Sequence, residues 1–261
     1  MRAATALALG LALAVAASGA GCNGQDEAPV SAVRTTDKPA GPVVLTPAGS
    51  TAPASGAIVG RDVDFHRKRL HLRTAGPEDG PPVLLLHGQK FDSSTWESLG
   101  TLAVLAQNGM RAIAIDVPGY GKSEAIELTP DTFLEELIPA LGISRPVIVA
   151  PSMGGTFALP FVVAHPDAVA GFVPIAPAGL ETWLPKLQGC SVPTLIVWGS
   201  EDTVIPVAEA DQLAGAMKNS RTLILQGAPH PAYLERPSEF HEALVKFVRE
   251  VSAAGGGDTG R

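Results

Sequence analysis

The sequence predicts an α/β fold, in which a mostly parallel central sheet is covered by helices on both faces. After residue 56, short apolar runs alternate with stretches of helical spacing, and that order is typical of βαβ units. Hydrophobic residues make up 46% of the chain but aromatic residues only 5%, so Val, Leu, Ile and Ala must form the core. The length of 261 residues suits one large domain with extra segments.

The first folded segment, Ala57 to Arg73, contains two alternating runs and predicts an antiparallel hairpin with Phe65, Leu70 and Leu72 pointing inward. Turn signals bound the later apolar runs, which predict strands at 83–86, 112–115, 147–149, 171–175, 195–198 and 223–225. Helical spacing predicts helices at 95–108, 131–141, 153–165, 207–217 and 237–251.

A short gap separates the strands at 171–175 and 195–198. Residues 177–192 leave room for one short helix, around Leu180 to Leu187, and for little else. We therefore expect a minimal cap and an open carboxyl edge of the sheet.

The N-terminus has the layout of an export signal, with a positive start, an apolar run from Ala3 to Ala17 and small residues up to Cys22. The ending Ala20-Gly21-Cys22 resembles a bacterial lipobox, although Gly19 stands where leucine is usual. We expect residues 1–22 to be a lipoprotein-type signal peptide, and lipidated Cys22 to anchor an exported bacterial protein to the membrane. Cleavage after Ala20 would leave a soluble secreted protein instead. An uncleaved anchor is disfavoured, because a spanning helix needs about 20 strongly apolar residues.

The composition divides the rest of the chain into three parts. Residues 23–55 are rich in Pro, Ala, Gly, Ser and Thr and predict a disordered linker. The folded domain is expected at 56–252, followed by a disordered tail at 253–261. No disulfide is expected between Cys22 and Cys190, because Cys22 belongs to the targeting signal.

Charge and spacing exclude several function classes. The formal net charge is −7, and the densest basic run, Arg67-Lys68-Arg69, reads as the solvated side of a strand rather than a nucleic-acid footprint. The run Gly119 to Ser123 ends like a phosphate-binding loop, but Asp116 stands where that motif needs glycine. Paired histidines and CxxC spacings are absent from the sequence, so neither a metal nor another cofactor is expected.

The strand at 147–149 leads into Ala150-Pro151-Ser152-Met153-Gly154 and then into a helical stretch. A serine on a strand-to-helix turn, with small residues two before and two after it, is typical of a nucleophile elbow. Ala150 replaces the commoner glycine, and Gly154 matches. A serine at this place could also be a simple helix N-cap.

Two further residues complete a catalytic set. Asp202 follows the strand at 195–198 and His230 follows the strand at 223–225, in the chain order Ser, Asp, His that this arrangement requires. Asp202 stands three residues after Gly199, and its neighbour Glu201 is expected to face solvent. The remaining histidines that lie outside these loops are expected on the surface: His66, His71, His165 and His241.

The loop His87-Gly88-Gln89-Lys90 follows the first parallel strand and has the layout of an oxyanion loop. We assign the oxyanion donors to the backbone N–H groups of Gln89 and Met153, and we expect His87 to brace the loop. The expected pocket wall consists of Met153 and three aromatic residues: Phe91, Trp183 and Tyr233.

Several motifs together resemble the α/β-hydrolase superfamily over residues 57–252, and within it the small CIB-like group (abhydrolase domain-containing protein 14). They are LLLHGQKFDSSTWESLGTLA, AIAIDVPGYGKS, APSMGG, GFVPIAP and GAPHPAYLERP. The resemblance implies the α/β-hydrolase fold and a triad of Ser152, Asp202 and His230. It also implies a structural role for the turn at Asp116. Hydrolysis of small acyl esters is the implied activity, with acyl-lysine deacylation as a further one.

The sequence therefore predicts a serine hydrolase that cleaves small acyl esters through an acyl-enzyme intermediate and takes a small acyl compound as its partner. Thioester, amide or carbon–carbon bond hydrolysis on the same triad are the enzymatic alternatives. A non-catalytic interaction module is the third class. The sequence does not indicate an oligomeric state.

Overall fold

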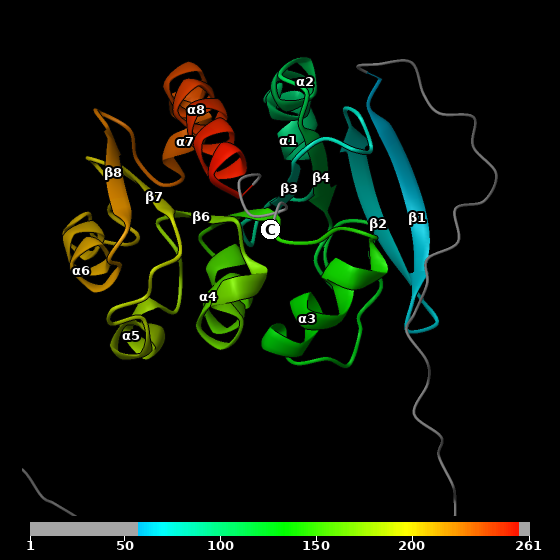
Figure 1. Cartoon of the computed structure of the whole chain (residues 1–261), viewed down its shortest axis with the longest axis horizontal. Helices are drawn as coiled ribbons and strands as arrows, with labels where there is room; N and C mark the ends of the chain where they lie inside the picture. The colour runs from blue at the N-terminus through cyan, green and yellow to red at the C-terminus, as the bar shows by residue number, and fades with distance from the viewer. Residues whose placement is uncertain (1–56, 256–261) are drawn as a thin grey trace, which may run out of the picture. The chain divides into compact units, whose positions relative to one another are not determined.

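A computed structural model describes residues 57–255, which build one eight-stranded sheet in the order β1-β2-β4-β3-β5-β6-β7-β8 (Figure 1). The first two pairs in that order are antiparallel, and all later pairs are parallel. The strands are β1 (Val59–Phe65), β2 (Lys68–Ala75), β3 (Pro82–Leu85), β4 (Arg111–Ile115), β5 (Val147–Pro151), β6 (Gly171–Ile175), β7 (Thr194–Gly199) and β8 (Ser220–Leu225). This arrangement confirms the predicted fold class.

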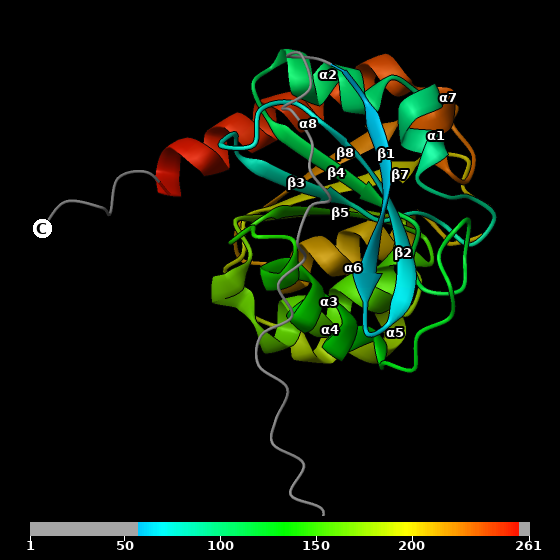
Figure 2. The same ribbon diagram turned by 90° about the vertical axis from the view of Figure 1, so that its right-hand side faces the viewer.

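Helices cover both faces of the sheet, as Figures 1 and 2 show. On one face lie α1 (Ser94–Ser98), α2 (Thr101–Gln107), α7 (Ala232–Glu235) and α8 (Pro237–Gly255). On the other lie α3 (Pro130–Ala140), α4 (Gly154–Ala164), α5 (Leu180–Trp183) and α6 (Ala208–Ala216). Each layer has its own apolar core against the sheet, so the parallel strands are buried on both sides.

The N-terminal hairpin forms as predicted, with Phe65, Leu70 and Leu72 fully buried on the α3 side of the sheet. The surface assignment of His71 was wrong. His71 points to the opposite face, is only 6% exposed, and its Nδ1 bonds the Asp62 carboxylate. Alternation alone placed this residue outside, but α2 contacts β2, so the face opposite Leu70 and Leu72 is also packed.

The predicted helix at 95–108 is two helices. Gly100 has a φ of +81° between α1 and α2, a left-handed conformation that glycine adopts without steric cost. The short α7 was not predicted, and α8 continues to Gly255, three residues past the predicted domain end.

Between β6 and β7 the described chain forms only α5 and a single 3₁₀ turn, Leu184–Lys186. This is the minimal cap expected from the short gap. It leaves the carboxyl edge of the sheet without an additional domain above it.

Residues 1–56 and 256–261 lie outside the described part, so the signal peptide, Cys22, the linker and the end of the tail stay predictions. Within residues 57–255, no helix combines the length and apolar character needed to span a membrane. Cys190, in the same region, is half-buried and forms no disulfide.

Candidate active site

Ser152 occupies a sharp turn between β5 and α4. Its φ is +46°, a left-handed conformation that costs a non-glycine residue energy and is typical of functional sites. The turn is held from both sides: the Ser152 N–H donates to the Ile175 carbonyl at 3.0 Å, and the Ser152 carbonyl accepts the N–H groups of Gly155 and Ala178, each at 2.8 Å. This is the strained strand-to-helix geometry expected of a nucleophile elbow.

The turn is so tight that two glycines are needed after it. A Cβ on Gly154 would lie 3.1 Å from the Leu86 Cβ, and one on Gly155 would lie only 2.5 Å from the Pro177 Cβ. The sequence pattern identified Gly154, but the stricter requirement at Gly155 comes from the next strand's loop and was missed.

Asp202, just after β7, bonds His230, which follows β8. Its side chain is fully buried, and its Oδ2 lies 2.8 Å from Nδ1 of His230, whose side chain is 11% exposed. The Asp202 Oδ1 accepts the N–H groups of Val204 and Ile205, each at 2.9 Å. Three hydrogen bonds therefore fix the carboxylate, while Glu201 is exposed to solvent as predicted.

The loops that carry these residues meet at one edge of the sheet. Ser152, Asp202 and His230 follow β5, β7 and β8, and the carboxyl ends of parallel strands lie together. The Glu201 N–H donates to the Ala228 carbonyl at 3.0 Å, which ties the second loop to the third. The Ser152 Oγ forms no hydrogen bond with any atom of residues 57–255, a loose arrangement common in unliganded sites.

Gly199, where β7 ends, provides a test of this packing. An added Cβ would lie 2.2 Å from the Ala228 carbonyl oxygen, so Gly199→Ala must push the Asp202 and His230 loops apart. We expect turnover to fall about 10²-fold, the cost of a displacement of roughly 1 Å in an active site. Steady-state kinetics of the folded variant checks this.

Gly215 in α6 is the matched control, because nothing lies within 4 Å of an added Cβ there. Gly215→Ala should leave turnover unchanged. Equal turnover of the two alanine variants would contradict the proposed contact between the loops.

The predicted oxyanion donors are unused. Neither the Gln89 nor the Met153 backbone N–H donates a hydrogen bond to the described chain, and a Cβ on the adjacent Gly88 would lie 3.6 Å from the Ser152 Cβ. His87 braces this loop as expected. It is fully buried and bonds both the Gly88 carbonyl and the Val117 N–H, and desolvation by burial lowers the pKa of its imidazole.

The residues predicted to form the pocket wall differ in burial. Phe91, Met153 and Trp183 are half-buried. A Cβ on Gly88 would lie 3.3 Å from Cδ2 of Phe91 and 3.6 Å from the Cβ of Ser152, so the Phe91 ring is near the serine. Tyr233 was wrong as a wall residue. It is fully buried and stacks on Trp96 with ring centroids 4.8 Å apart, because α7 turns it into the core. Burial also raises the pKa of its hydroxyl.

The other sequence motifs have structural explanations. Asp116 is buried, and its carboxylate accepts the Ser93 and Lys122 N–H groups at 2.7 Å each, so this stretch is a hydrogen-bonded turn. The basic run Arg67-Lys68-Arg69 is exposed. Among the residues that the structure describes, no group of three or more His, Cys, Asp or Glu side chains could hold a metal ion.

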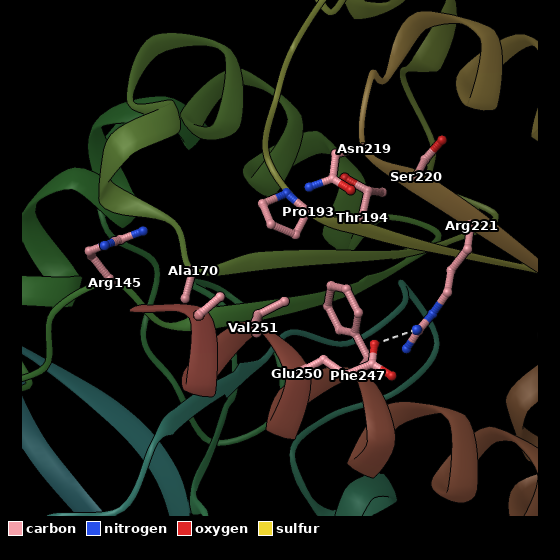
Figure 3. A pocket seen from close by; sticks show the side chains of 11 residues that line it. Arg145, Ala170, Pro193, Thr194, Asn219, Ser220, Arg221, Phe247, Glu250 and Val251 are labelled. Atoms are coloured by element: carbon pink, nitrogen blue, oxygen red, sulfur yellow. Dashed lines mark hydrogen bonds and ion pairs between the residues drawn. The ribbon is translucent and has the colours of Figure 1, made fainter. Parts of the chain in front are cut away.

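A surface cavity of about 450 Å³ lies elsewhere, at the amino ends of β6, β7 and β8 (Figure 3). Phe247 lies in its middle, Arg145 at one side, and the ion pair of Arg221 with Glu250 at the other. None of the predicted site residues lines it.

Comparisons with known proteins agree with this fold. The family described as alpha/beta hydrolase fold matches residues 81–189. The chain is 38% identical over 205 residues to zebrafish (Danio rerio) ABHD14A, covering 76% of each protein. It is 40% identical over 199 residues to human (Homo sapiens) ABHD14B, provisionally named a protein-lysine deacylase, covering 72% of this chain and 93% of that protein.

Solved structures give the same result. A CIB-like hydrolase from Thermoplasma acidophilum aligns with a TM-score of 0.71 at 30% identity, over 74% of this chain and 99% of that one. Naproxen esterase from Bacillus subtilis shares the fold, with a TM-score of 0.65 at 18% identity, over 74% of this chain and 92% of that one. The chain is therefore an enzyme of hydrolase type and belongs to the α/β-hydrolase family, in the group that contains ABHD14A and ABHD14B.

Proposed function

We propose that this protein is a serine hydrolase that cleaves small acyl esters through an acyl-enzyme intermediate. The observation that carries the proposal is the strained Ser152, with a φ of +46°, at the same sheet edge as the hydrogen-bonded pair of Asp202 and His230. Strain at a serine and a buried carboxylate on a histidine are both costly and are explained together by nucleophilic catalysis.

In the proposed mechanism, the Nε2 of His230 takes the proton of Ser152 as the Oγ attacks the acyl carbon. Asp202 accepts the Nδ1–H, which holds the imidazole in the required tautomer and stabilises the imidazolium. The N–H groups of Gln89 and Met153 stabilise the negative charge on the tetrahedral oxygen. His230 then protonates the leaving alcohol, and a water molecule releases the acid by the same steps.

A fluorophosphonate probe tests the proposal directly, because it reacts covalently with an activated serine. We expect labelling of the wild type and none of Ser152→Ala. Ser144→Ala is the matched control, since Ser144 is an exposed serine just before the opposite end of β5. An unlabelled wild type would favour a non-catalytic interaction module.

The minimal cap leads to a prediction about acyl length. With only α5 and one 3₁₀ turn beside the site, we expect short acyl groups to be preferred and the alcohol to be loosely restricted. A series of p-nitrophenyl esters of increasing chain length measures this through kcat/KM. A preference for long-chain triglycerides with activation at a lipid interface would contradict it.

Amide hydrolysis is a second candidate, favoured by the 40% identity with ABHD14B and its provisional name. The same triad can cleave an acyl-lysine amide, with the amine as leaving group. Comparing kcat/KM for an acetyl-lysine peptide with that for p-nitrophenyl acetate separates the two candidates.

A further inference from the structure

The peptide unit between Gly88 and Gln89 is held from one side only. Its carbonyl oxygen accepts two hydrogen bonds, from Nδ1 of His87 at 2.9 Å and from the Phe91 N–H at 3.0 Å. A trans peptide is planar, so its C=O and its N–H point in opposite directions. Whatever fixes the Gly88 carbonyl therefore also sets the direction of the Gln89 N–H.

The second nitrogen of His87 reaches another segment. The Val117 N–H donates to the His87 Nε2 at 3.0 Å. Because an amide N–H can only donate, Nε2 must be the acceptor, and the proton of the neutral ring lies on Nδ1. The buried imidazole therefore joins the loop at Gly88 to the turn that begins at Asp116.

Asp116 adds a second connection between the same two segments. Its Oδ1 accepts the Ser93 N–H, at the end of the segment that joins β3 to α1, and its Oδ2 accepts the Lys122 N–H within the turn, both at 2.7 Å. Asp116 is 2% exposed, so water does not replace these bonds. The turn is thus bonded to the segment between β3 and α1 at two places, His87 and Ser93.

We propose that His87 and Asp116 are positioning residues that aim the Gln89 N–H at the oxyanion, with the turn from Asp116 to Ser123 as their support. This inference rests on the proposed function, because it assigns how one oxyanion donor is oriented. It gives a specific role to a turn whose resemblance to other hydrolases implies only a structural one.

Two substitutions of His87 test it. His87→Leu keeps a buried side chain but removes both hydrogen bonds of the imidazole, so the Gly88 carbonyl keeps only the bond from the Phe91 N–H and the direction of the Gln89 N–H is less firmly fixed. We expect kcat for p-nitrophenyl acetate to fall by about 10²- to 10³-fold, the cost of losing one oxyanion donor, with KM nearly unchanged. His87→Gln offers one donor and one acceptor, and it should restore most of the activity.

The affinity of a reversible trifluoromethyl ketone inhibitor is a second readout, which a purely structural role of His87 would not change. The inhibitor forms a tetrahedral oxyanion on Ser152, so its affinity depends on the oxyanion donors. Its affinity should fall in parallel with kcat in His87→Leu. His241→Leu is the matched control: it removes a half-buried histidine that bonds only Thr101, between α2 and α8, and should change neither quantity.

Asp116→Asn provides an independent arm if His87→Leu does not fold. The new amide must face the Ser93 or the Lys122 N–H with its own NH₂, so one bond is lost, and we expect kcat and inhibitor affinity to fall about ten-fold. A folded variant of His87 or Asp116 that kept both quantities within two-fold would overturn the inference. Ser152→Ala tests the proposed function separately, since an active Ser152→Ala would refute that function itself.

Discussion

Replacing Ser152 with alanine is expected to abolish ester hydrolysis while leaving the fold intact. The substitution removes only the Oγ, which forms no hydrogen bond within residues 57–255, so little stability depends on it. In another Ser-His-Asp enzyme, loss of the serine costs about 10⁶-fold in turnover. Steady-state hydrolysis of p-nitrophenyl acetate measures the loss, and thermal unfolding reports the fold.

The strain at residue 152 adds a second expectation for the same variant. Alanine must adopt the φ of +46° as serine does, because the hydrogen bonds to Ile175, Gly155 and Ala178 involve the backbone alone. The melting temperature should therefore stay near that of the wild type. Near-normal turnover in Ser152→Ala would show that another nucleophile does the chemistry.

The second large effect is expected at Asp202. Asp202→Asn keeps the shape of the side chain, but its NH₂ group faces groups that themselves donate: the Val204 and Ile205 N–H groups or the Nδ1–H of His230. If the amide NH₂ faces His230, the imidazole changes to the tautomer that cannot accept the Ser152 proton. The equivalent change costs about 10⁴-fold in a chymotrypsin-type enzyme, and we expect a loss of that order in kcat.

Glu201→Gln is the control for that measurement. Glu201 is adjacent in sequence and also carries a carboxylate, but its side chain is exposed, and its backbone N–H contacts the His230 loop through the Ala228 carbonyl. Little change in kcat is expected. The reverse pattern, with Glu201→Gln inactive and Asp202→Asn active, would mean that the acid had been assigned to the wrong residue.

The sequence by itself determined the class of fold and the order of its elements. Buried parallel strands need continuous apolar runs. The runs at 83–86, 112–115 and 195–198 predict strands whose first and last residues each differ by at most one position from those of β3, β4 and β7. It also selected Asp202 over Glu201, because the distance from Gly199 to the acid is local and depends only on one loop.

Only the tertiary structure decided which side chains face the site. Tyr233 is close to His230 in sequence, yet α7 turns its ring onto Trp96, a residue 137 positions earlier in the chain. His71 lies on a strand with the expected alternation, but it is buried because α2 packs against β2 on the face opposite Leu70 and Leu72.

The support of the oxyanion loop shows the same division. Sequence identified His87 and the turn at Asp116 as separate motifs, and nothing in their spacing links them. Two hydrogen bonds link them: the Val117 N–H donates to His87, and the Ser93 N–H donates to Asp116. Each bond joins the segment that follows β3 to the segment that follows β4. Neighbouring parallel strands bring such segments together in space, and a contact of that kind depends on the register between strands rather than on local sequence.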